Sequence, residues 1–223
     1  PSDLLVLSDG SSVLAYNSQE PCNVLGSGMS CITATGVSKL ASAWIHLSAN
    51  GQPIGQSVVL SQQGRSPKLR EADGKLLVLT SNWDRFNPFT GSWTLGRYGL
   101  GGQLDTGFGE QGLLQSTCAT EGSALQVDST GAIWVAGTIE RASSWPAKGR
   151  SVCVQHLSAN GLAHPSHPAP LVQTLNLNAK VLDLRVLPSQ QVVVAGSTNG
   201  EPARDNVYRW QIDPQTAGQG TLS

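Results

Sequence analysis

Residues 95–114, LGRYGLGGQLDTGFGEQGLL, predict a short apolar strand, a glycine-rich turn and a second strand. Degraded copies of this stretch recur along the chain. The hexapeptide HLSANG occupies residues 46–51 and returns 110 residues later at 156–161, and RYGLGG at 97–102 lies between the two copies. A fourth, worn copy is RWQIDP at 209–214. Recurrence at intervals of about 50–60 residues is typical of repeat and propeller architectures.

A second motif alternates with the first, and an apolar strand follows each of its copies. The copies lie at 5–10, 69–74, 125–131 and 184–189, and the strands at 13–16, 76–79, 133–137 and 192–196. Together the two motifs define four units, approximately 1–62, 63–116, 117–176 and 177–223. Each unit is too small to bury its own apolar face, so we expect the units to pack on one another.

Asp-Gly and Asn-Gly pairs stand between the apolar runs. They predict tight two-residue hairpins, because both central residues of a type I′ turn require φ > 0. No segment of ten or more residues has the i, i+3, i+4 apolar spacing of a helix, so no helices are predicted. The expected fold is therefore all-β, a β-propeller-like array of four four-stranded antiparallel blades in a single domain over residues 1–223.

The second unit carries the pattern RYxxxGxLDxxFGxxG in residues 97–112. With the VAG strands that end at Gly137 and Gly196, this pattern resembles the delta-60 repeat family of bacterial β-propeller-like proteins. Only the second unit keeps the LDxxFG half; the other units keep the strands and turns. The resemblance implies a fold and a bacterial, usually cell-surface or secreted, setting, and it implies no catalytic residues.

Composition limits the partners that the chain can bind. Charged residues make up 13% of the sequence, the net charge is −1, and only five lysines occur. Nucleic acids and anionic membranes are bound through clusters of basic side chains, so neither is an expected partner. The expected partner is a protein or a glycan.

The sequence contains neither a signal peptide nor a run of 18 apolar residues. We expect a chain that does not insert into a membrane and that is processed or belongs to a larger protein or assembly. The expected location is secreted, cell-surface or periplasmic.

The four cysteines are Cys22, Cys31, Cys118 and Cys153, and their spacing matches no zinc-ribbon, thioredoxin-like or haem-attachment motif. In an exported protein they are expected to form disulfides. Four cysteines allow three pairings, and we predict Cys22 with Cys31 and Cys118 with Cys153.

Three local motifs have simpler explanations than cofactor or metal binding. Residues 107–112 match G-x-G-x-x-G, but no helix follows to bind phosphates, so the glycines are interpreted as turn residues. Asp105-Thr106-Gly107 resembles the aspartic protease tripeptide but has no second copy to share a proton. His164 and His167 offer two metal ligands where three or four are normally needed. No cofactor and no metal site is expected.

No G-x-S-x-G, H-E-x-x-H or P-loop pattern occurs, so no hydrolase or nucleotidase motif is available. An enzyme built on a propeller could still gather carboxylates from several first strands. The candidates for such a cluster are Asp3, Glu71, Asp128 and Asp183. A hydrolase or lyase with its site at the channel therefore stays an alternative.

Trp83, Arg85, Phe86 and Phe89 lie in one long predicted loop, and Trp145 lies in the corresponding loop of the next unit. If these side chains are exposed, tryptophan and arginine are the residues that dominate protein interfaces, and stacking on a sugar ring is the competing use. If they pack between blades, they are core. The prediction is a non-catalytic interaction or adhesion scaffold that binds its partner through the long-loop face, with a carbohydrate-binding module as the alternative.

Overall fold

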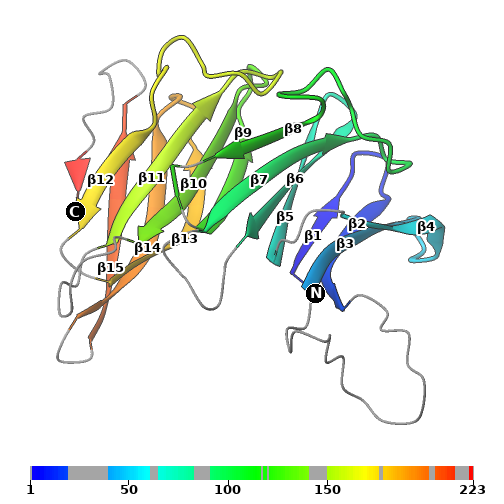
Figure 1. The fold of residues 1–223 in the computed structure, drawn as a ribbon, viewed down its shortest axis with the longest axis horizontal. Coiled ribbons are helices and arrows are strands. Elements are labelled where there is room, and N and C mark those ends of the chain that lie inside the picture. The colour runs from blue at the N-terminus through cyan, green and yellow to red at the C-terminus, as the bar shows by residue number, and fades with distance from the viewer. Residues whose placement is uncertain are drawn as a thin grey trace.

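A computed structural model describes residues 2–19, 40–60, 65–82, 91–116, 118–119, 121–140, 150–175, 178–200, 204–213 and 221–222. Within these ranges the chain forms four antiparallel sheets of four strands each and no helix, which confirms the all-β prediction. Strands that are consecutive in sequence are neighbours in each sheet, so every sheet is a meander. Figure 1 shows the sheets following one another from β1–β4 (blue to cyan) on the right to β13–β15 (orange) on the left.

We number the sheets 1 to 4 in chain order. Sheet 1 contains β1 (Asp3–Val6), β2 (Ser12–Gln19), β3 (Leu40–Leu47) and β4 (Pro53–Val59). Sheet 2 contains β5 (Arg65–Ala72), β6 (Lys75–Asn82), β7 (Ser92–Tyr98) and β8 (Leu113–Ser116). Sheet 3 contains β9 (Glu121–Val127), β10 (Ile133–Glu140), β11 (Arg150–Leu157) and β12 (Leu171–Leu175). Sheet 4 contains β13 (Asn178–Val186), β14 (Val192–Gly200), β15 (Arg204–Ile212) and β16 (Thr221–Leu222).

Only one of the Asp-Gly and Asn-Gly hairpins has the predicted geometry. Asp73 and Gly74 both have positive φ, 52° and 69°, as a two-residue type I′ turn requires. At the other sites only the glycine does, with φ of 83° at Gly10 and 79° at Gly51. The N–H of Gly10 donates to the carbonyl of Leu7 at 3.1 Å, which closes a longer loop with a single left-handed residue. The type I′ prediction is wrong at these sites, because a turn that ends in a bulge needs only one such residue.

Three hydrophobic cores join the four sheets in series. We call the face of a sheet that points toward the next sheet its front face, and the opposite face its back face. Each core joins the front face of one sheet to the back face of the next. Each of the first three sheets contributes one tryptophan to the core in front of it, Trp44, Trp93 and Trp134, all 1% exposed. In the described part of the chain, none of these cores joins sheet 4 to sheet 1.

The first strands of successive sheets lie close together. β5 contacts β1, β9 contacts β5, and β13 contacts β9. Asp3 Oδ2 accepts a hydrogen bond from the Leu69 N–H at 2.8 Å, and Arg70 Nε donates to Gln126 Oε1 at 3.2 Å. The sheets therefore converge along their first strands.

The LDxxFG stretch of the second unit joins sheet 2 to sheet 3. Asp105 Oδ2 accepts from Lys75 Nζ and Arg97 Nε, each at 2.6 Å, and the Lys75 hydrogen bond is the main cause that lowers the pKa of Asp105 to about 2. The Arg97 guanidinium also donates to the Ala159 carbonyl at 2.7 Å and lies over the Phe108 ring. Asp105 thus binds two side chains of sheet 2, and Arg97 links that sheet to the Ala159 carbonyl in the turn after β11.

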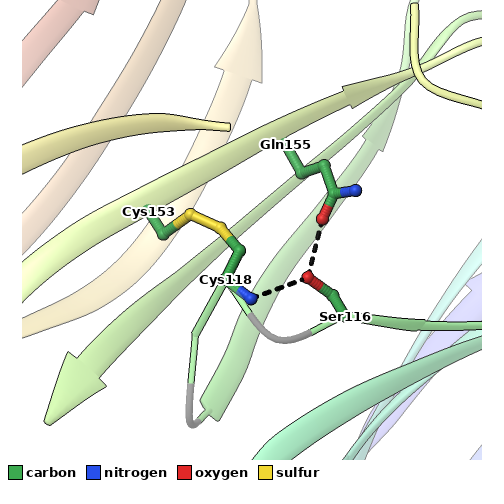
Figure 2. Close-up of a disulfide and its surroundings, with 4 residues drawn as sticks. All are labelled: Ser116, Cys118, Cys153 and Gln155. Carbon is green, nitrogen blue, oxygen red and sulfur yellow. Dashed lines mark hydrogen bonds between the residues drawn. A yellow bond between two sulfur atoms is a disulfide. The ribbon is translucent and has the colours of Figure 1, made fainter. Parts of the chain in front are cut away.

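A disulfide between Cys118 and Cys153 confirms one of the two predicted pairings. It ties the segment before β9 to β11, with the Cα atoms 6.1 Å apart (Figure 2). In the same view the Cys118 N–H donates to Ser116 Oγ at 3.0 Å, and that hydroxyl donates to Gln155 Oε1 at 2.7 Å. A disulfide indicates an oxidising compartment. The described residues include no helix long and apolar enough to cross a membrane.

The other predicted pairing, Cys22 with Cys31, lies outside the described residues. It stays a prediction.

Candidate functional site: the back face of the first sheet

The residues predicted to bind a partner, Trp83, Arg85, Phe86, Phe89 and Trp145, all lie outside the described residues. Whether they bind a partner or pack as core is therefore untested. In the described part of the chain, the candidate binding surface is the outermost face of the first sheet.

The back face of sheet 1 is apolar and uncovered by any described sheet. Val13 and Ala15 of β2 are fully buried against sheet 2, so alternation along the strand places Leu14 on the back face. Leu4 of β1 pairs with Leu14 and shares its face, as does Val6 two residues on. Leu4 is 58% exposed and Val6 is 65% exposed. Two large aliphatic side chains of β1 thus face outward.

The third and fourth strands extend this surface. Ile45 and Leu47 of β3 lie on the back face because Trp44, which precedes Ile45 in the same strand, points to the opposite face and packs in the core with sheet 2. Val59 of β4 pairs with Ala43 on the same face and is 57% exposed. We define the sheet 1 back face by its described residues Leu4, Val6, Ser12, Leu14, Tyr16, Ile45, Leu47, Pro53 and Val59; Ala43 lies on the same side but is fully buried. None of these residues is charged.

The other three sheets show what this face looks like when it is covered. In every sheet a leucine of the first strand stands opposite an aliphatic residue of the second strand on the back face. The pairs are Leu4 with Leu14, Leu69 with Val78, Leu125 with Val135, and Leu184 with Val194. The leucines of sheets 2, 3 and 4 are at most 1% exposed, because the preceding sheet covers each of them.

The opposite end of the array has a different chemistry. On the front face of sheet 4, Arg209 is exposed and donates to Gln211 Oε1 at 2.9 Å, and Arg185 Nε lies 2.9 Å from Asp183 Oδ2. Arg209 pairs with Ala195 at the register position that Trp44, Leu95 and Val154 occupy in sheets 1, 2 and 3. Sheet 4 therefore ends the array with a solvated face, whereas sheet 1 ends it with an apolar one.

Three of the four carboxylates predicted on the first strands accept hydrogen bonds from nearby backbone N–H groups or side chains. Asp3 accepts from the backbone of β5, and Asp183 accepts from the Leu184 N–H at 2.9 Å and from Arg185. Asp128 accepts from Trp134 Nε1 at 3.1 Å. Burial acts to raise the pKa of Asp128, but hydrogen bonds from its own turn and from Trp134 outweigh burial and lower that pKa. Their described roles are structural.

Three histidines gather beside Trp134 in sheet 3. The His156 ring stacks on Trp134 at 3.6 Å and on His164 at 3.9 Å, and His156 Nδ1 lies 3.0 Å from His167 Nδ1. Burial is the main cause that lowers the pKa of His156 to about 3, and burial also lowers the pKa of His167. Among the described residues no group of three ligands is arranged to hold a metal ion. His156 and His167 are buried and pack as neutral rings beside Trp134.

Sequence reasoning missed the sheet 1 back face, although a signal was present. The first strand reads Leu4-Leu5-Val6-Leu7, apolar on both faces, which is the pattern of a strand covered on both sides. By contrast, aromatic and polar side chains alternate in β15, which reads Tyr208-Arg209-Trp210-Gln211. This is the pattern of a strand in a sheet with one solvated face.

Comparison with known proteins adds no function. No family model matches the chain, and no curated protein matches it. A hypothetical protein from Leishmania major is similar over 82% of this chain and 56% of its own, with 14% identity and a TM-score of 0.43. A polysaccharide lyase of family PL25, an ulvan lyase, is similar over 97% of this chain and 56% of its own, with 10% identity and a TM-score of 0.41.

A protein of unknown function from Dyadobacter fermentans is similar over 96% of this chain and 79% of its own, with 11% identity and a TM-score of 0.36. The chain thus spans about half the length of the first two proteins. Similarity of this degree carries no argument about activity.

Proposed function

We propose that this chain is a non-catalytic interaction scaffold and that a protein partner docks on the sheet 1 back face. One observation carries the proposal: Leu4 is 58% exposed at a position where the three equivalent leucines are covered by a neighbouring sheet. Uncovered apolar surface of this kind marks sites of protein interaction, because water is released when a partner covers it. With net charge −1 and an uncharged docking face, affinity comes from apolar contact rather than from electrostatic steering.

The proposed setting is a bacterial cell surface or the secreted fraction, and the proposed architecture is β-propeller-like. The Cys118–Cys153 disulfide supports an oxidising location. The convergence of β1, β5, β9 and β13 supports an arrangement in which the sheets radiate from their first strands. In such an arrangement a rigid stack of sheets holds its end face and its loops at defined positions, which suits a scaffold.

The test is site-specific photo-cross-linking. Photoreactive p-benzoylphenylalanine replaces Val6 in the full chain, which is then irradiated with secreted and envelope proteins of the producing organism. Val207 is the matched control, because it is an exposed valine, 78% accessible, on the outer face of the other end sheet. We expect a protein adduct at Val6 at least about tenfold more abundant than at Val207, and its loss when Leu4→Lys is added. Equal yields at the two positions, or no adduct at Val6, contradict the proposal.

A glycan array separates the carbohydrate-binding alternative. Glycan binding that Leu4→Lys leaves unchanged would place the function elsewhere on the chain and would favour that alternative.

A further inference from the structure

We infer that the occupant of the sheet 1 back face is a fifth sheet of the same repeat type, one that presents a tryptophan-bearing front face. This inference rests on the proposed function, because it names the partner of the same surface. It commits to one chemistry of partner: a four-stranded antiparallel sheet whose exposed side matches the front faces of sheets 1, 2 and 3.

The three interfaces between described sheets share one pattern of back-face residues, and the back face of sheet 1 has the same pattern. In each interface a first-strand leucine and two second-strand aliphatic residues of the back face meet the front face of the preceding sheet. The covered sets are Leu69, Leu76 and Val78; Leu125, Ile133 and Val135; and Leu184, Val192 and Val194. The set in sheet 1 is Leu4, Ser12 and Leu14, which retains both aliphatic residues that pair directly. On a solvated sheet face, polar residues are expected at the positions of Leu4 and Leu14.

The three interfaces also share a feature of the covering sheet, which supplies one tryptophan to each of them. Trp44 enters the core on sheet 2, Trp93 the core on sheet 3, and Trp134 the core on sheet 4. One tryptophan from the covering sheet therefore fills every interface of this kind in the chain. Because the sheet 1 back face continues this stack in the same direction, the partner that fits it supplies the same side chain.

Charge separates this partner from a second copy packed head to tail. In a head-to-tail dimer the front face of sheet 4 would cover the sheet 1 back face, and its tryptophan, Trp210, points instead into its own core with sheet 3. Arg209 would lie at the position of Trp44, opposite an apolar surface that offers no carboxylate. Burying a guanidinium opposite a surface without a counter-charge is unfavourable, so sheet 4 is a poor occupant.

The experiment converts sheet 4 into the proposed partner. Trp93 and Leu95 occupy in β7 the register positions that Val207 and Arg209 occupy in β15. The double variant Val207→Trp with Arg209→Leu therefore copies the front face of sheet 2 onto the end of the full chain. Both positions are exposed, so neither change disturbs the core.

Analytical ultracentrifugation of the full chain reads out association. We expect the double variant to form head-to-tail oligomers at least about tenfold more tightly than the wild type, and we expect Val6→Lys, added to it, to restore the monomer. Arg209→Leu alone is a second, milder variant that should show the same dependence on Val6. Circular dichroism checks that every variant keeps the β-sheet spectrum.

The outcomes separate the inference from the function on which it rests. A double variant that stays monomeric, or whose association survives Val6→Lys, overturns the inference. A wild-type dimer that Val6→Lys dissociates identifies a second copy as the occupant and also overturns it, while the docking surface stands. Failure of the cross-linking at Val6 contradicts the docking surface itself.

Discussion

The buried histidine His156 makes stability depend on pH in a calculable way. Its ring lies between Trp134 and His164 and is 5% exposed, and its pKa is lowered to about 3, first by burial and then by the neighbouring His164 and His167. The unfolded chain holds the same group at its ordinary pKa of 6.5. The folded pKa is therefore depressed, so its contribution to stability is fully present above pH 6.5 and is lost as pH falls toward 3.

The size of the loss at pH 5 follows from the unfolded state. At that pH the folded His156 is still neutral, whereas the unfolded imidazole is almost fully protonated. The difference lowers the free energy of unfolding by about 2 kcal/mol between pH 7 and pH 5. The result holds for any folded pKa well below 5. His167 contributes in the same direction, because burial lowers its pKa too.

Carboxylates do not obscure this window. The pKa of Asp105 is lowered to about 2 from an ordinary value of 3.8. A depressed carboxyl pKa contributes stability that is lost only as pH falls from about 4 downward. The change in the free energy of unfolding between pH 7 and pH 5 therefore comes from the histidines. The geometry acts in the same sense, since the His156–His167 hydrogen bond requires at least one unprotonated Nδ1.

Urea unfolding at pH 7 and pH 5 measures the effect. His156→Phe keeps a ring between Trp134 and His164 but cannot bind a proton, so its loss of stability between the two pH values should be about 2 kcal/mol smaller than that of the wild type. His46→Phe is the matched control, because His46 occupies the equivalent place in sheet 1. A His156→Phe variant that loses as much stability as the wild type over this interval refutes the reasoning.

Two further predictions concern the disulfide at sheet 3 and the contact of sheet 3 with Phe108. Replacing Cys118 and Cys153 together by Ala opens a cross-link between residues 35 apart and should lower the free energy of unfolding by about 3–4 kcal/mol; a loss below about 1 kcal/mol in urea titration would show that the disulfide adds little. Gly161→Ala should destabilise by about 2–4 kcal/mol, since φ is +82° and the new Cβ would lie 2.8 Å from Phe108. Gly51→Ala, with φ of +79° and no atom within 4 Å, should cost only about 1–2 kcal/mol. Equal thermal shifts for these two glycine variants would mean that the Phe108 contact is unimportant.

The strands could be read from the sequence because their signals are local. Apolar runs separated by glycine turns predicted four strands in every unit, and the described structure contains them. The type of turn was harder to predict. Asp73-Gly74 and the Asp-Gly pair that ends at Gly10 have the same letters but different loops, because the register of the flanking strands decides how many residues take positive φ.

The pairing of Cys118 with Cys153 was also predicted and is confirmed, while the aromatic loop with Trp83 and the pairing of Cys22 with Cys31 stay predictions outside the described residues.

The sequence by itself determined the all-β class and the four-stranded make-up of the four sheets, since both depend on neighbours along the chain. Only the tertiary structure decided which apolar residues are core and which are surface. Leu4 and Leu69 are the same residue type at the same register position, yet one is 58% exposed and the other fully buried. The reason is that burial depends on what packs against a face, and the neighbour of sheet 1 on its back side is set by the order of sheets in space rather than by any residue of β1.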